Sequence, residues 1–217
     1  MDELVTRLLR LQVSSLSDAD KTLPVADPAI HALIPDVTLV GVAFTVRADG
    51  DLLGMIDAIG RAEPGTVLVV ATDGRPLAAS GELFATEGRR RGLAGIVVDG
   101  YCRDLRGIRR VGLPVYARGT TPAAGPALGP AVVGEPVTFG GVEVRPGDLV
   151  VGDDDGLLIA PPERIAAAVD RAEEIERVEG EVAAGMRAGR SLHELTNAPE
   201  HLRAIAAGEP STFRFQP

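Results

Sequence analysis

The chain has 217 residues, enough for one large domain with a real core or for a compact domain with appendages. Its apolar content of 45% is normal for a globular protein, but aromatic residues make up only 3% and tryptophan is absent. The core must therefore be built from Val, Leu, Ile and Ala. The formal net charge of -9 argues against a protein that wraps nucleic acid, because phosphate binding needs a basic face.

The expected cellular setting follows from three further features. The single cysteine, Cys102, excludes an internal disulfide framework and fits a reducing compartment. The first residues, MDEL, lack the basic and apolar regions of a signal peptide. Apolar runs stay below the roughly 18 residues that span a bilayer. We therefore expect a cytoplasmic protein with no membrane partner.

The N-terminal part alternates between expected helices and strands. Apolar spacing and capping residues predict short helices at 4–11 and 14–20. The β-branched segment 37–49 predicts a strand pair or one long bent strand. Helical spacing returns at 51–62, and the continuous apolar run at 66–72 predicts a strand covered on both faces.

The middle of the chain repeats this alternation. Residues 82–92 predict a helix that ends in three arginines and a glycine, both favoured at a helix C-terminus. Residues 94–100 predict a second buried strand, and 112–119 predict a short one. Strands and helices joined by short connections indicate a parallel layer.

The C-terminal part changes character after a loop rich in Pro, Gly and Ala at 120–130. Short alternating runs between 131 and 161 predict several antiparallel strands, and 162–188 predict a long, charge-laced helix. Residues 196–217 have weak periodicity and are expected to form a tail or a packing arm. The predicted organisation is one α/β domain over 1–195, with parallel and antiparallel strands and flanking terminal helices.

An Arg-Asp pair directly follows the buried strand at 94–100. Such pairs usually form surface ion pairs or cap the next segment, but Arg103 and Asp104 stand where open α/β sheets bind ligands. A companion feature is Gly81, which precedes the helix at 82–92. We expect the free backbone amides of its first residues to form an anion site; these residues are Gly81, Glu82, Leu83 and Phe84.

These groups together suggest metal-assisted carbonyl chemistry. Asp104 offers hard oxygen ligands suited to Mg²⁺ or Mn²⁺, and Arg103 can grip a carboxylate or stabilise an enolate. If the two sites face one pocket, they could hold a divalent metal and a small 2-oxo acid. The only lysine, Lys21, is far from these motifs, which argues against a Schiff-base aldolase.

The segment 80–104, SGELFATEGRRRGLAGIVVDGYCRD, resembles the signature of the 4-hydroxy-4-methyl-2-oxoglutarate aldolase family. That family also contains proteins similar to the regulator of ribonuclease activity A, called RraA-like. The spacing from Gly81 to Arg103 matches its pattern. Further matches lie along most of the chain, in SSLSDAD, GVAFTV, EPGTVLVV, LPVYARGTTP and VRPGDLVVGDDDGLLIAP.

The resemblance implies a swivelling β/β/α fold and a homotrimer or a pair of trimers, with active sites between subunits. It implies that Asp104 holds Mg²⁺ or Mn²⁺, largely through water, and that Arg103 contacts the substrate's C2 oxygen and stabilises the pyruvate enolate. Amides of residues 81–84 would bind the pyruvyl carboxylate, and Glu82 would help to position metal-bound water. The implied reactions are pyruvate-releasing aldol cleavage and oxaloacetate decarboxylation, which share the enolate.

Two other functions stay open. The first is a non-catalytic RraA-like regulator that binds and inhibits an RNA-processing enzyme such as ribonuclease E. The second is an enzyme of the same scaffold that acts on a different 2-oxo or hydroxy acid.

The sequence departs from the family pattern at Gly107, where family aldolases commonly have an acidic residue. A missing carboxylate would weaken the water shell of the metal. The acidic run 153–155 either compensates for it or forms a solvated hairpin tip. Cys102 is interpreted as a small buried residue, because no feature of the sequence activates it.

Overall fold

The structure is a computed structural model, and it describes residues 1–49, 51–72 and 74–217. It divides into two compact units, Met1–Val169 and Asp170–Pro217. The boundary between the two units follows Val169, whereas the sequence predicted one domain over residues 1–195. That domain extent stays a prediction. Within the described residues, every helix is too short or too polar to cross a membrane.

The first unit is built on a nine-stranded mixed sheet whose central strands are parallel. The order along the sheet is β1-β6-β5-β3-β2-β10-β11, with β4 (Ala78–Ser80) beside β5 and β7 beside β2. Strands β2, β3, β5 and β6 pair in parallel, which confirms the parallel layer predicted from the apolar runs. The segment 37–49 forms one strand rather than a pair. The bounds are Leu39–Arg47 for β2, Thr66–Ala71 for β3, Gly95–Cys102 for β5 and Val115–Thr120 for β6.

The remaining strands are mostly antiparallel, as the alternating pattern after residue 130 predicted. Strand β10 pairs antiparallel with β2 and β11, while β8 and β9 form a separate hairpin. Short edge strands β1 and β7 pair antiparallel with β6 and β2. The bounds are His31–Ala32 for β1, Val132–Val133 for β7, Val137–Phe139 for β8, Val142–Val144 for β9, Leu149–Asp153 for β10 and Gly156–Ala160 for β11.

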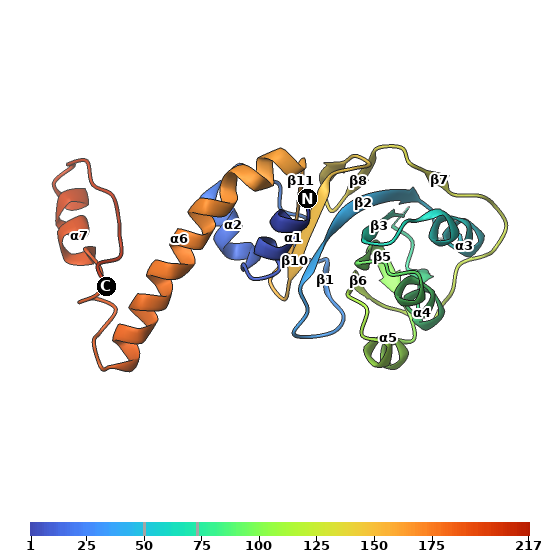
Figure 1. The fold of residues 1–217 in the computed structure, drawn as a ribbon, viewed down its shortest axis with the longest axis horizontal. Coiled ribbons are helices and arrows are strands. Elements are labelled where there is room, and N and C mark those ends of the chain that lie inside the picture. The colour runs from blue at the N-terminus through green and yellow to red at the C-terminus, as the bar shows by residue number, and fades with distance from the viewer. Residues whose placement is uncertain (50, 73) are drawn as a thin grey trace. The chain divides into compact units, whose positions relative to one another are not determined.

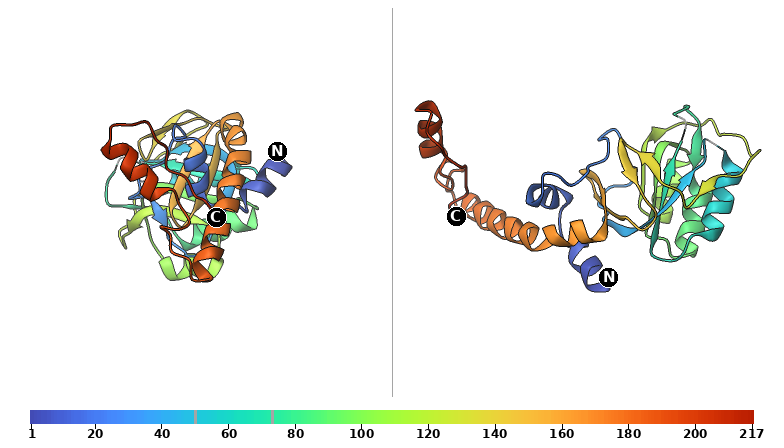
Figure 2. Two further views of the ribbon diagram at one scale, coloured as in Figure 1. Left: turned by 90° about the vertical axis from the view of Figure 1, so that its left-hand side faces the viewer. Right: turned by 90° about the horizontal axis from the view of Figure 1, so that it is seen from above.

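Successive side chains of the central strands point to opposite faces of the sheet, and each face is covered by another layer. Leu68 and Val70 of β3 face a core that includes Met55 and Ile108 from helices, whereas Val69 faces the opposite core, with the β8–β9 hairpin. Three helices therefore cover one face of the sheet and a β-hairpin covers the other (Figures 1 and 2). The helices are α3 (Leu52–Arg61), α4 (Glu82–Arg90) and α5 (Leu105–Val111). This is the expected β/β/α arrangement.

The terminal helices lie close to the positions predicted from the sequence, and the structure has one further helix near the C-terminus. Helices α1 and α2 fall at the two predicted N-terminal positions, and α6 follows the predicted long helix closely. The segment 196–217, expected as a tail or arm, contains the helix α7. In that segment Asn197 Nδ2 donates to the backbone carbonyl of Thr212 at 2.9 Å. The bounds are Asp2–Leu8 for α1, Val13–Ala19 for α2, Pro162–Arg187 for α6 and Ala198–Ala206 for α7.

Asp51 makes the start of α3 sensitive to acid. Its carboxylate accepts from the amides of Leu53 and Leu128, both at 2.8 Å, and of Gly129 at 3.1 Å. The bond from Leu128, followed by those from Leu53 and Gly129, lowers the pKa of Asp51 below 3.8 and outweighs the opposing effect of desolvation. The ionised form is thus the one that stabilises the fold.

We expect Asp51→Ala to lower the free energy of unfolding at neutral pH, because α3 loses its cap and the loop at 128–129 loses its anchor. The difference from wild type should shrink as the pH falls through 3.8 and vanish below the lowered pKa of the folded state. Denaturant unfolding measured across this range checks the prediction. A difference that stays constant down to the lowest pH would contradict it.

Candidate functional site

Strand β4 (Ala78–Ser80) explains how two distant parts of the sequence meet. Strand β3 pairs with β5 only as far as Ala71 opposite Asp99. Beyond this point β4 takes its place beside the last residues of β5, again in parallel. The Arg103 amide then donates to the Ser80 carbonyl at 2.9 Å. Because the two strands are parallel neighbours, Gly81 and Arg103 leave the sheet side by side.

Gly81 lies in close contact with the Arg-Asp pair. A methyl group at this position would be 2.9 Å from Asp104 Oδ2 and 3.0 Å from Arg103 Cγ. It would also be 3.4 Å from the Arg103 carbonyl oxygen. The expected convergence of these two motifs is therefore what the geometry shows, and a side chain at Gly81 would disturb the pair.

The N-terminus of α4 presents free donors at the same place. The first intrahelical acceptor is the Gly81 carbonyl, which binds the Ala85 amide at 3.0 Å. The preceding amides of Glu82, Leu83 and Phe84 have no acceptor one turn earlier, and the N-cap residue Gly81 has no side chain to cap them. The arrangement suits an anion such as a carboxylate.

Asp104 has an unusual backbone conformation. Its φ of 57° places it in the left-handed region, where a non-glycine residue costs about 1–2 kcal/mol. It is also the N-cap residue of α5, but its side chain does not cap the helix. The carboxylate is instead 3.4 Å from Arg103 Nε, and the two side chains keep 45% and 39% of their exposure respectively. Asp104 thus remains accessible to a ligand.

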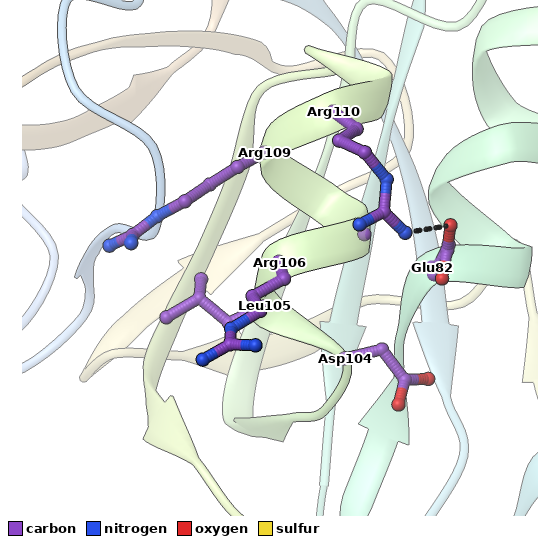
Figure 3. A pocket seen from close by; sticks show the side chains of 7 residues that line it. Glu82, Asp104, Leu105, Arg106, Arg109 and Arg110 are labelled. Atoms are coloured by element: carbon purple, nitrogen blue, oxygen red, sulfur yellow. Dashed lines mark hydrogen bonds and ion pairs between the residues drawn. The ribbon is translucent and has the colours of Figure 1, made fainter.

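Two adjoining hollows open onto this carboxylate. One has a volume of about 290 Å³ and is lined by Arg103, Asp104, Leu105, Thr120, Thr121 and Pro122. The other, of about 560 Å³, is lined by Glu82, Asp104, Leu105, Arg106, Gly107, Arg109 and Arg110 (Figure 3). Four arginines border a site in a chain with net charge -9, so the local charge favours anionic ligands.

The donor set fits a hydrated magnesium or manganese ion rather than a closed protein cage. Asp104 and Glu82 supply carboxylate oxygens to the larger hollow. Among the described residues, His, Cys, Asp and Glu form no group of three or more that could hold a metal. Mg²⁺ is commonly held by one or two carboxylates and keeps several waters. The Asp104 carboxylate fits this requirement, whereas Glu82 Oε1 pairs with Arg110 Nη2 at 3.0 Å.

The acidic run 153–155 has a structural role instead. Asp153 Oδ2 accepts from the Val13 amide at 2.8 Å, and Asp154 Oδ2 accepts from the Asp36 amide at 3.1 Å. Residues 153–156 form the turn between β10 and β11. The interpretation as a hairpin tip is confirmed, and none of the three aspartates lines either hollow.

Cys102 takes no part in the chemistry of the site. It is fully buried, and burial raises the pKa of its thiol to about 12. The thiolate is therefore scarce at neutral pH, and the thiolate is the nucleophilic form. The interpretation as a small buried residue is confirmed.

Two sets of lining residues were not predicted from the sequence. Thr120 ends β6 and Thr121 follows it. The C-terminal end of β6 lies at the same sheet edge as that of β5, so the predicted parallel pairing could have identified both residues. Arg110 comes from α5, which has only seven residues and was not predicted as a helix. Its guanidinium Nη2 lies 3.0 Å from Glu82 Oε1.

With this geometry established, comparison with known proteins identifies the family. Residues 13–159 match the model of the RraA-like family, described as Aldolase/RraA. The chain belongs to the RraA-like family. The matched range holds both the Gly81 turn and the Arg-Asp pair.

Three similar proteins show the kinds of name that occur among the relatives of this chain. A protein of Halalkalibacterium halodurans, provisionally named 4-hydroxy-4-methyl-2-oxoglutarate aldolase, is 36% identical over 161 residues, covering 73% of this chain and 77% of the relative. Streptomyces coelicolor RraAS2, described as an unusual member of the RNase ES inhibitor RraA family, has a TM-score of 0.71 at 30% identity, with 83% and 95% coverage. RraA of Thermus thermophilis, described as an RNA-processing inhibitor, has a TM-score of 0.64 at 28% identity, with 69% and 92% coverage.

Proposed function

We propose that this RraA-like protein is a divalent-metal-dependent class II aldolase of the 4-hydroxy-4-methyl-2-oxoglutarate type, which releases pyruvate and also decarboxylates oxaloacetate. One observation carries the proposal: the free amides that follow Gly81 and the side chains of Arg103 and Asp104 meet at one accessible place. The aldolase names of relatives support the reaction class.

Different groups of the site would bind the carboxylate and the C2 oxygen of a 2-oxo acid. The amides of Glu82, Leu83 and Phe84 would bind its carboxylate, which the positive end of α4 also favours. Arg103 would donate to the C2 oxygen. The backbone of Arg103 is fixed against Ser80, so the guanidinium starts from a defined position.

Both proposed reactions pass through the same anion. In retro-aldol cleavage, the C4 hydroxyl loses its proton to water acting as the base and C4 becomes a carbonyl. The C3–C4 bond breaks and its electrons move to the C2 oxygen, which gives the enolate of pyruvate; the enolate then takes a proton from water at C3. In oxaloacetate decarboxylation, CO₂ leaves with the same result. Arg103 stabilises the charge that develops on oxygen, and this is the interaction that must strengthen in the transition state.

Asp104 would hold Mg²⁺ or Mn²⁺, and Glu82, which lines the same hollow, would help to position metal-bound water. The ion, when bound, would supply Lewis acidity toward the 2-oxo group. A Schiff-base route is disfavoured, because the only lysine, Lys21, is 74% exposed and pairs with Asp18 outside both hollows. The family resemblance also leads us to propose a cytoplasmic homotrimer or hexamer with sites between subunits, in which Leu83, 77% exposed at the start of α4, would be covered.

The regulatory function stays as the second candidate, because the similar RraA structures are described as inhibitors of RNA processing. One experiment separates the two. Pyruvate release is measured from oxaloacetate and from 4-hydroxy-4-methyl-2-oxoglutarate, with added Mg²⁺ or Mn²⁺ and after chelation. We expect turnover that is lost on chelation and restored by the metal. Inactivity on both substrates, together with inhibition of ribonuclease E, would favour the regulator.

Gly81→Ala is expected to reduce kcat/KM about tenfold with little effect on stability. The added methyl group would push Asp104 and Arg103 away by a few tenths of an ångström, less than the 1 Å displacement that costs about 100-fold. Both side chains are half-exposed and can move without unfolding the chain. Gly60→Ala is the matched control, because the space around Gly60 is open. Equal activity in the two variants would contradict the proposed role of the turn.

A further inference from the structure

The larger hollow carries positive charge that the proposed binding of the pyruvyl group does not use. Arg106, Arg109 and Arg110 line it from α5, and the acidic residues that face them there are Glu82 and Asp104. Residues three and four apart on a helix share a face, so the spacing of 106, 109 and 110 places the three arginines on one side of α5. The hollow therefore suits a ligand with an anionic group of its own at this end.

Two of the three arginines are already engaged with the protein. Arg110 Nη2 lies 3.0 Å from Glu82 Oε1, and Arg109 Nε donates to the Leu33 carbonyl at 3.5 Å. Beside Arg110, α5 packs directly against Glu82, because a methyl group at Gly107 would lie 2.2 Å from Glu82 Cδ. This side of the hollow is thus occupied by the side chain of Glu82.

Arg106 is the arginine of this set whose charge remains available to a ligand. It is exposed, and within the part of the chain that the structure describes its guanidinium makes no hydrogen bond or ion pair. Asp104 lies two residues earlier, and side chains at this spacing on a helix do not face each other. In Figure 3 Arg106 extends from α5 on the side of Leu105, whereas Arg110 extends toward Glu82. Asp104 and Leu105 line both hollows, so a ligand that spans the two passes the start of α5, where Arg106 stands.

We propose that Arg106 determines substrate specificity by binding a second carboxylate, the one at the far end of a 2-oxo dicarboxylic acid. The inference rests on the proposed function, in which the amides of α4 bind the C1 carboxylate and Arg103 donates to the C2 oxygen. The C4 or C5 carboxylate of such a substrate then still needs a partner. A guanidinium whose donors are unengaged can bind a carboxylate through two parallel hydrogen bonds.

The first test uses ligands that the enzyme cannot cleave. 2-Oxoglutarate and 2-oxopentanoate have carbon chains of the same length and differ in a terminal carboxylate against a methyl group. Neither has the C4 hydroxyl that aldol cleavage requires. Binding of each to the full chain is measured by titration calorimetry with Mg²⁺ present. We expect wild type to bind 2-oxoglutarate about tenfold more tightly or better, as for a hydrogen bond between charged groups, and Arg106→Met to bind both ligands equally.

The second test applies the same contrast to turnover. In 4-hydroxy-4-methyl-2-oxopentanoate a methyl group replaces the C5 carboxylate of 4-hydroxy-4-methyl-2-oxoglutarate. Arg106→Met should lower kcat/KM about tenfold for the dicarboxylate and leave it unchanged for the monocarboxylate. Arg106→Lys should keep part of the preference, because it keeps the charge but loses the paired donors. Arg90→Met is the matched control: Arg90 pairs with Glu87 on α4 outside both hollows, and the preference should not change.

The outcomes separate this inference from the function it rests on. A wild type that neither binds 2-oxoglutarate nor releases pyruvate overturns both. A wild type that releases pyruvate without distinguishing the members of either pair overturns the inference alone, and so does a preference that Arg106→Met retains. Preferential binding of 2-oxoglutarate that Arg106→Met abolishes, without turnover of any substrate, supports the role of Arg106 and contradicts the aldolase. Thermal unfolding checks that the variants are folded, which an exposed position favours.

Discussion

Replacing Asp104 by asparagine is expected to reduce metal-dependent pyruvate release at least about 100-fold, because the carboxylate proposed to hold the divalent ion is lost. Asparagine keeps the shape of the side chain and tolerates the left-handed backbone at φ 57°. The change therefore removes charge and leaves the fold of the turn intact. Steady-state rates over a range of Mn²⁺ concentrations measure the effect.

The chain offers a matched control for this substitution. Asp36 is also exposed and has a φ of 56°, but its place is outside both hollows. Asp36→Asn should leave the rate and its metal dependence unchanged. If both variants lost activity to the same degree, the cause would be general destabilisation and the role assigned to Asp104 would be wrong.

Much of the fold could be predicted because its strongest signals are local. The runs at 66–72 and 94–100 are apolar at nearly every position, as strands covered on both faces must be. The structure places helices on one side of them and the β8–β9 hairpin on the other. Arg103 and Asp104 follow the second run. The end of a buried strand can be located from the local sequence, so these two residues could be identified as well.

The two elements that bring the site residues together, β4 and α5, have weaker secondary-structure signals in the sequence. Strand β4 has only three residues, in a segment with no alternation, and α5 has seven residues of which three are arginines. Both are held by neighbours rather than by their own propensity, since most helical stability in proteins comes from tertiary packing. The contact of Glu82 with Gly107 joins two helices and cannot be read from either one.

The structure changes the interpretation of Gly107 that the sequence suggested. From the sequence alone, a glycine in place of an acidic residue indicated a weaker metal site, and the run 153–155 was considered as a source of compensation. The structure assigns Asp153 and Asp154 to backbone contacts near Val13 and Asp36. It also places Glu82 in the volume above Gly107. Glu82, rather than a side chain at position 107, therefore occupies this volume.

The fold brings the site together through one irregularity in β5. The register of its pairing with β6 shifts between Val98 and Tyr101, next to the point where β3 ends. The strand continues beyond that point and finds a new partner in β4. Without this extension, the chain would leave the sheet before Arg103, and the turn at Gly81 would have no strand beside it. Irregular strand ends of this kind are common next to active sites.

Arg103→Lys is expected to lower kcat about 100- to 1000-fold, the range found when a donor to a developing oxyanion is removed. Lysine keeps the charge but replaces a planar fork of donors by a single ammonium group. The KM should change little, because in the proposed binding mode the substrate carboxylate is bound by the amides of α4, which the substitution leaves unchanged.

The split between kcat and KM decides what Arg103 does. A fall in kcat alone means that the guanidinium interacts more strongly with the transition state than with the substrate. A rise in KM at constant kcat would instead assign Arg103 to ground-state binding and contradict the enolate role. Arg61→Lys is the control: Arg61 pairs with Asp57 on the exposed side of α3, and neither kinetic constant should change. Because the Arg103 amide is already held by Ser80, the backbone of the lysine variant should stay in place. The kinetics would then report on the guanidinium itself.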